Sequence, residues 1–158
     1  MSESVDILGT GLVSCLGIGV SRVYQSMCAG GCGIRNLTRF DASPYPQACG
    51  GQLAADDEAM VREAFPEDDF ATAMIKVAGA EALGGAGGGD AERLGLILAT
   101  NFGPVESLEW AWSERLETGQ LSTDSFEPFE QVTAQVAEFF DGGGPRCQVS
   151  MSCASGAA

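Results

Sequence analysis

The chain has 158 residues, of which 45% are hydrophobic and 19% charged, and its 22 acidic against eight basic side chains give a formal net charge of −14. This length suits a single domain with a buried core, while so acidic a surface repels phosphate backbones and argues against nucleic-acid binding. No stretch approaches the roughly 20 apolar residues of a membrane helix, and the N-terminus lacks the basic region of a signal peptide, so we expect a cytoplasmic protein without a membrane partner.

The chain opens with the patterns of a strand and a helix. The stretch "SVDILGTGLVS" predicts a buried strand that runs into a glycine-rich turn. In "GVSRVYQSMCAGGCG", helical spacing relates four apolar residues, Val20, Val23, Tyr24 and Met27. The turn-forming residues of 34–54 then predict a loop that ends in a short strand at 49–54.

A helix and a strand are predicted next. The stretch "DDFATAMIKVAGAEAL" is the clearest helix, because Asp68 and Asp69 suit the positive end of the helix dipole and an alanine-rich body follows. The glycine-rich run 84–89 predicts a flexible surface link rather than a phosphate loop, since no Lys-Ser/Thr pair follows it. The stretch "RLGLILATNFG" predicts a second buried strand over residues 94–100.

The last third of the chain predicts two helices, a strand and the start of another helix. "PVESLEWAWSERLETG" has proline at the first helical position and Leu108, Trp112 and Leu116 on one face. In "EPFEQVTAQVAEFFDGGGP" the helical spacing turns one set of residues inward, namely Phe129, Val132, Val136 and Phe139 or Phe140. "RCQVSM" predicts a third strand, and "SCASGAA" resembles the opening of a helix. Strands alternating with helices predict an α/β fold with parallel strand pairs.

Gly9 and Gly11 nearly complete the dinucleotide-binding pattern G-x-G-x-x-G. Ser14 replaces the third glycine, and no acidic residue ends a second strand about 20 residues further on, where the ribose partner belongs. A strand followed by a tight glycine turn explains the pair better than a nucleotide site does.

Six cysteines, at positions 15, 28, 32, 49, 147 and 153, lie mostly among apolar or small residues. Without a signal peptide or a repeated spacing they predict free thiols, buried or half-buried, rather than disulfides. Cys28 and Cys32 have the spacing of half a zinc site, but no second pair follows and the chain has no histidine, so we expect no metal. The lack of histidine also means that any Cys–His chemistry needs an imidazole from elsewhere.

Cys153 is the candidate nucleophile. A cysteine in the first turn of a helix faces unpaired backbone N–H groups, which favour the thiolate and can stabilise an oxyanion on a thioester carbonyl. Its neighbours are small and leave room for a substrate, and a strand that runs directly into a sharp turn commonly presents a nucleophile above a sheet. A plain core cysteine is the alternative, and Ser152 and Ser155 are weaker candidates because neither has a base in this chain.

The chain resembles the N-terminal portion of β-ketoacyl-acyl carrier protein synthases. Matching stretches run collinearly along it: "VDILGTGLVSCLGIGV", "DDFATAMIKVAGAEAL", "LGLILATNFGPVESLE" and "GPRCQVSMSCASGAA". Individual matches in the first third are Leu16, Gly17, Gly33, Ile34, Arg35, Arg39, Phe40 and Asp41. The last stretch is similar to the family's Gly-Pro, strand and nucleophile motif, which identifies Cys153 as the acyl-accepting residue.

The resemblance implies the N-terminal half of a thiolase-like duplicated βαβαβ fold, truncated at the start of the nucleophile helix. It also implies that Cys153 takes an acyl group from a thioester and that a decarboxylated malonyl thioester then attacks it. The family's catalytic histidines belong to the C-terminal half, so we expect residues 1–158 to be an incomplete domain that is inactive alone. The implied partners are an acyl carrier protein and either a second copy of the chain or a complementing C-terminal half. The resemblance implies no cofactor.

A non-catalytic partner or remnant, similar to chain-length-factor subunits, is the alternative function. Those subunits typically lack the nucleophilic cysteine, so Cys153 favours the catalytic reading. By the same resemblance, the strand 146–151 pairs across the two-fold axis of family dimers.

Three positions bear on substrate and partner binding. Ser152 stands where the family commonly has alanine, a small change. The acidic stretch 66–69 stands where basic residues often help to dock the carrier protein, which puts docking through this face in doubt. Phe102 lies where a glycine-rich turn lines the family's acyl pocket, so it either limits acyl chain length or packs into the core beneath the loop.

Overall fold

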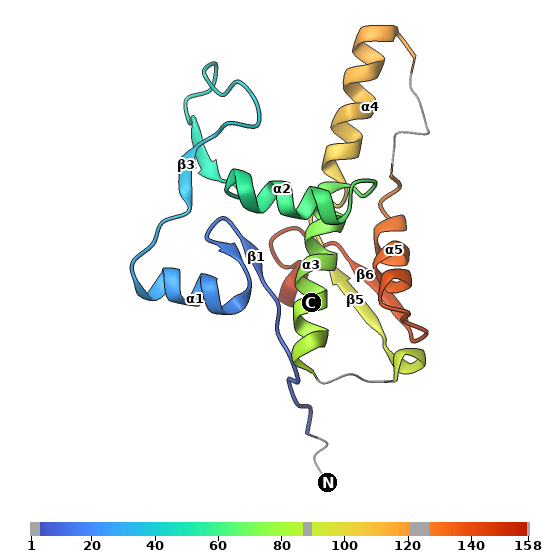
Figure 1. Ribbon diagram of the computed structural model, residues 1–158. Helices are drawn as coiled ribbons and strands as arrows, with labels where there is room; N and C mark the ends of the chain where they lie inside the picture. The colour runs from blue at the N-terminus through green and yellow to red at the C-terminus, as the bar shows by residue number, and fades with distance from the viewer. Residues whose placement is uncertain (1–3, 87–89, 121–126, 158) are drawn as a thin grey trace. The chain divides into compact units, whose positions relative to one another are not determined.

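The computed structural model describes residues 4–86, 90–120 and 127–157, and the chain divides into two compact units (Figure 1). The first unit comprises Met1–Ala64 and Val77–Gly87, and the second comprises Phe65–Lys76 and Gly88–Ala158. Helix α3 (Phe70–Gly85) therefore contributes its first part to the second unit and its last part to the first. Among the described residues no helix is both long and apolar enough to cross a membrane.

The first unit is built from two small hairpins and two helices besides the end of α3. Strands β1 (Val13–Ser14) and β2 (Gly17–Ile18) pair antiparallel, and β3 (Ile34–Asn36) pairs in the same way with β4 (Cys49–Gly51). Helix α1 spans Val20–Cys28 and helix α2 spans Ala55–Ala64. The helix predicted around Val20–Met27 and the short strand predicted at 49–54 are confirmed as α1 and β4, whereas β3 and α2 were not predicted.

A single carboxylate on α3 joins both sides of the first hairpin. Glu81 accepts hydrogen bonds from the backbone N–H of Leu12 (3.0 Å) and of Val20 (2.8 Å), the first residue of α1. Between these contacts the N–H of Gly19 donates to the carbonyl of Leu12 (2.8 Å). Glu81 thus satisfies an N–H at the start of α1 that has no partner within the helix.

The two glycines of the near-fingerprint owe their identity to close packing on α3. A β-carbon at Gly9 would overlap the carbonyl oxygen of Ala82, and one at Gly11 would overlap that of Ala78. The segment 4–12 that carries them is not a buried strand, so that prediction is wrong: Val5 is 93% exposed. A strand needs a neighbour for its backbone hydrogen bonds, and no described segment pairs with this one.

The second unit contains the parallel strand pair that the pattern predicted. Strand β5 (Leu96–Ala99) lies beside β6 (Arg146–Val149) in a register that pairs Leu96 with Arg146 and Ala99 with Val149. This unit also contains the first part of α3, helices α4 (Val105–Thr118) and α5 (Gln131–Phe139), and two short 3₁₀ turns, η1 (Ala91–Arg93) and η2 (Ser155–Ala157). In Figure 1, α5 runs alongside the β5–β6 pair.

The core of the second unit lies between α5 and this pair. Leu98, Val132 and Val136 are almost fully buried and pack with Ile75, Leu96 and Phe140. The inward face predicted for α5 is therefore confirmed at Val132 and Val136. The strand 94–100 is buried on one face only, because Ile97 is 76% exposed.

The burial predicted for the cysteines fails at five of the six positions. Cys15 is half-buried and the other five are exposed, although all six are free thiols as expected. The helix predicted from Pro104 is confirmed as α4, whose residues Leu108, Trp112 and Leu116 are exposed while Ser107 and Ala111 are buried. The run of glycines predicted to form a link starts inside α3, and residues 87–89 lie outside the described part of the chain.

The close approach at Gly11 gives a test with a matched control. Gly11→Ala should lower the free energy of unfolding by about 1–3 kcal/mol, because backbone atoms must shift to accept the new methyl group. Gly84 lies in α3 with open space where a β-carbon would stand, so Gly84→Ala should leave stability unchanged or raise it by up to about 1 kcal/mol. Urea denaturation followed by circular dichroism measures both, and equal midpoints for the two variants would contradict the packing explanation.

Candidate functional site

The candidate site lies where β5 and β6 end. Because the strands are parallel, their carboxyl ends meet at one edge of the sheet, and the N–H of Thr100 extends the pairing to the carbonyl of Val149 (3.1 Å). Residues 100–104, the Phe102 loop, follow β5, and residues 150–157, the nucleophile turn, follow β6. The topology thus brings both sequence-predicted site residues, Phe102 and Cys153, to the same edge.

The nucleophile turn has a strained backbone immediately before Cys153. Ser152 has φ of 51°, in the left-handed region, which costs about 1–2 kcal/mol for a residue other than glycine. Such outliers persist only where the surroundings enforce them, and they concentrate at functional sites. Cys153 itself is exposed among the described residues.

Within the described residues, the segment after Cys153 forms a short 3₁₀ turn, η2, where "SCASGAA" predicts the opening of a helix. Cys153 precedes this turn and forms an isolated parallel bridge with Met151. The backbone turns are closed by bonds from Ala154 N–H to the Met151 carbonyl (3.1 Å) and from Ser155 N–H to the Ser152 carbonyl (3.1 Å).

Ser155 holds the nucleophile turn in shape. Its side chain is buried at 7% exposure, and its hydroxyl accepts from the Met151 N–H (2.8 Å) while donating to the Ser152 carbonyl (2.7 Å). The hydroxyl therefore spans the strained residue and is fully engaged. The sequence analysis treated Ser155 only as a weak nucleophile and missed this structural role. The local pattern that could have indicated it is a serine three residues after Ser152, close enough to bond to the backbone of the turn.

The Phe102 loop is fixed on both sides of an exposed aromatic ring. Gly103 has φ of 60° and lies so close to the Phe129 ring that a β-carbon would overlap it. Its N–H donates to the Thr100 hydroxyl (3.1 Å), and the following Pro104 is buried. Phe102 itself is 73% exposed, so no core of the described residues buries it.

Much of the acidic stretch 66–69 is used inside the second unit. Asp68 forms an ion pair with the Lys76 ammonium (2.6 Å), and Lys76 also lies over the rings of Phe65 and Phe139. Asp69 is 6% exposed and accepts backbone hydrogen bonds from Ala71 (2.9 Å) and Ser107 (2.8 Å). Asp68 and Asp69 are thus engaged within the unit, while Glu67 is exposed.

Two carboxyl groups have shifted pKa values. Burial raises the pKa of Glu127, and the negative charge of Asp69 raises it further, against the opposing hydrogen bond from the Thr72 hydroxyl (3.3 Å). The exposed Asp41 has a lowered pKa because the side chain and backbone N–H of Ser43 bond to its carboxylate. Glu127 thus adds a second carboxyl group beside the buried Asp69.

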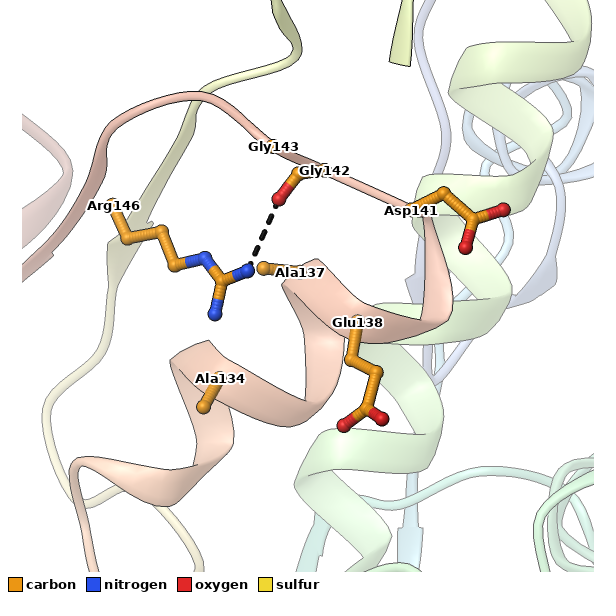
Figure 2. A pocket seen from close by; sticks show the side chains of 7 residues that line it. All are labelled: Ala134, Ala137, Glu138, Asp141, Gly142, Gly143 and Arg146. Atoms are coloured by element: carbon orange, nitrogen blue, oxygen red, sulfur yellow. Dashed lines mark hydrogen bonds between the residues drawn. The ribbon is translucent and has the colours of Figure 1, made fainter. Parts of the chain in front are cut away.

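A shallow hollow lies at the other end of β6, away from Cys153. Figure 2 shows its lining from α5 and the following turn, where the Arg146 guanidinium donates to the Gly142 carbonyl (3.1 Å). The lining residues are Ala134, Ala137, Glu138, Asp141, Gly142, Gly143 and Arg146. Because Arg146 begins the strand whose end carries the nucleophile turn, this hollow is separate from the candidate site. No group of three or more His, Cys, Asp or Glu side chains in the described segments is arranged to hold a metal ion.

Sequence comparisons identify proteins that are similar to this chain. A family model, "Beta-ketoacyl synthase, N-terminal domain", matches residues 2–158. The 3-oxoacyl-(acyl-carrier-protein) synthase 2 of Staphylococcus aureus (strain N315) is 28% identical over 98% of this chain and 40% of its own length. A Streptomyces violaceoruber protein named as a granaticin polyketide beta-ketoacyl synthase 2 is 30% identical over 72% of this chain and 29% of its own. The chain thus spans at most about 40% of the length of these relatives.

A solved structure shares the fold. The ishigamide ketosynthase/chain length factor superposes with a TM-score of 0.74 at 21% identity, covering 91% of this chain and 39% of that one. This likeness confirms the α/β architecture expected from the sequence, the N-terminal portion of a thiolase-like fold.

The role of Ser155 can be tested directly. Ser155→Ala should lower the free energy of unfolding by about 1–3 kcal/mol, because the Met151 N–H loses its acceptor while Ser152 keeps its strained backbone. Ser150→Ala, at an exposed position of the same turn, should change it by less than about 0.5 kcal/mol. Chemical denaturation compares the two, and an equally small effect at Ser155 would show that its hydroxyl does not hold the turn.

Proposed function

Because this chain belongs to the beta-ketoacyl synthase family, whose N-terminal domain it matches, we propose that it carries the acyl-accepting nucleophile of a condensing acyltransferase. The pathway would be fatty-acid or polyketide synthesis, by analogy with the relatives' names. Cys153 is the proposed nucleophile, and an acyl group on an acyl carrier protein is the proposed substrate.

The proposed reaction has two halves. The Cys153 thiolate attacks the carbonyl carbon of the acyl thioester, the tetrahedral oxyanion collapses, and the carrier thiolate leaves, so that the acyl group is bound to Cys153. A malonyl thioester then loses carbon dioxide, and the resulting carbanion attacks the acyl carbonyl. That step releases the Cys153 thiolate and yields a β-ketoacyl thioester.

The observation that carries this proposal is the presentation of Cys153. Its thiol is exposed at the carboxyl edge of the parallel pair, next to a strained residue whose carbonyl is bonded by a buried hydroxyl. An accessible thiol on a turn held in one conformation is what a large thioester substrate requires.

The second half-reaction needs groups that this chain does not contain. With no histidine in the sequence, the base and the donors that stabilise the decarboxylated intermediate have to come from other residues, either a C-terminal portion or a partner polypeptide. A homodimer is a further proposed assembly. It is supported by apolar side chains that this chain leaves exposed, such as Ile97 on β5 and Met151 in the nucleophile turn.

A non-catalytic role is the second candidate. It is favoured by the likeness to a structure described as a ketosynthase/chain length factor, a description that covers both a catalytic and a companion protein. A companion subunit would have no need of a reactive Cys153. Preferential acylation of this thiol is therefore the observation that separates the two candidates.

We expect incubation with an acyl-coenzyme A thioester to acylate Cys153 faster than the other exposed cysteines, with the modified peptide identified by mass spectrometry. Cys153→Ala should abolish this label. Cys147→Ala is the matched control, because it removes another exposed thiol from β6 and should leave the label in place. Equal labelling of all exposed cysteines would mean that Cys153 is merely accessible, which favours the non-catalytic role.

The proposal also assigns Phe102 to the acyl-binding surface, where a bulky ring restricts chain length. The chain should then react faster with butyryl- than with palmitoyl-coenzyme A, and Phe102→Ala should reduce this preference roughly tenfold. Phe40→Ala removes an exposed phenylalanine from the first unit and should leave the preference unchanged. If Phe102→Ala leaves the short-to-long ratio as it was, Phe102 does not limit chain length.

A further inference from the structure

A buried carboxylate links the start of α3 to the start of α4. Asp69 uses both of its oxygens: Oδ1 accepts from the N–H of Ala71 (2.9 Å) and Oδ2 from the N–H of Ser107 (2.8 Å). The first bond caps α3, as an aspartate before a helix commonly does. The second bond joins residues 38 positions apart in the sequence and contributes nothing to that cap.

The bond to Ser107 extends to the Phe102 loop. The Ser107 hydroxyl donates to the carbonyl of Pro104 (2.9 Å), the buried residue that ends this loop. The same hydroxyl lies within hydrogen-bond distance of the Glu127 N–H (3.4 Å). Asp69 therefore fixes Ser107, and Ser107 fixes the C-terminal end of the Phe102 loop.

The other end of the loop is attached to the sheet. Thr100 is bonded through its N–H to Val149, and its hydroxyl accepts from Gly103, which lies against the Phe129 ring. Phe102 is the large apolar residue that this framework leaves exposed, at 73% exposure. A large apolar side chain gains nothing from exposure to water, so a rigid loop that presents one suits contact with a ligand.

We propose that Asp69 is a positioning residue for acyl-chain selection, acting through Ser107 on the Phe102 loop. The inference rests on the proposed function, because Phe102 limits chain length only if Cys153 is acylated. An aspartate is required at this position because two N–H donors need an acceptor at the same time, and an asparagine has only one side-chain oxygen. A simple cap of α3 would explain one of the two bonds and neither the burial nor the contact with α4.

Asp69→Asn in the whole chain isolates this role. Asparagine caps helices about as well as aspartate, so its oxygen can stay with Ala71 while Ser107 loses its acceptor. Glu67→Gln is the matched control, because it removes the same charge from an exposed residue of the same stretch. The first readout is amide hydrogen exchange by NMR at Gly103, the residue that precedes Pro104 in the Phe102 loop. The second is the rate ratio of Cys153 acylation by butyryl- and palmitoyl-coenzyme A.

We expect Asp69→Asn to speed exchange at the Gly103 amide about tenfold, the effect of one lost hydrogen bond, without changing the amides of β5. It should also reduce the short-chain preference, and it should have no further effect on that preference when combined with Phe102→Ala. Glu67→Gln should change neither readout.

Unchanged exchange at Gly103 in Asp69→Asn would overturn the proposal, whatever the acylation results. Faster exchange with an altered chain-length ratio supports it. Faster exchange with a ratio that neither Asp69→Asn nor Phe102→Ala alters would overturn acyl-chain selection at Phe102, and with it the role of Asp69 in selection. If Cys153 is not acylated at all, the proposed function fails, while the exchange data still decide whether Asp69 positions the loop.

Discussion

The parallel pairing of β5 with β6 is the constraint on which the candidate site depends. Its register sets Ala99 opposite Val149, so the Phe102 loop and the nucleophile turn leave the sheet at the same edge. Within the part of the chain that the structure describes, this sheet has two strands, and burial of Leu98 against Val132 and Val136 of α5 stabilises it. A shift by one residue would turn Leu98 outward and move one loop relative to the other, so the same core contacts that hold the strands also set the site.

Short buried polar side chains then fix the segments that follow the strands. Loop backbones carry N–H and carbonyl groups without sheet partners, and each such group needs a partner if it is buried. Ser155 supplies two bonds in the nucleophile turn, Ser107 supplies one to the end of the Phe102 loop, and Asp69 supports Ser107 in turn. These side chains leave Cys153 and Phe102 exposed while fixing the backbone on which each stands.

The spacing of apolar residues predicted those helices and strands whose own residues mark out a buried face. Helix α5 and the parallel strand pair are examples, because Val132, Val136 and Leu98 mark the buried faces by spacing alone. The segment 4–12 was misassigned because a strand also needs a partner, which local pattern does not reveal. The roles of Ser155 and Asp69 were missed for a related reason. Asp69 reads as a surface charge or a helix cap in the sequence, and its bond to Ser107 exists only once α3 and α4 are packed together.

The chemistry divides between what this chain holds and what it lacks. Attack by a thiolate on a thioester needs an accessible sulfur, and the exposed Cys153 thiol meets that requirement in a chain without histidine. Decarboxylation creates a carbanion that has to be stabilised by cationic or neutral donors. This chain instead has a formal net charge of −14. Under the proposed function, acyl loading takes place on Cys153 of this chain, and the groups that stabilise the decarboxylated intermediate come from residues outside it. On that proposal, Phe102 limits which acyl group is loaded, and residues outside this chain determine whether the loaded group is extended.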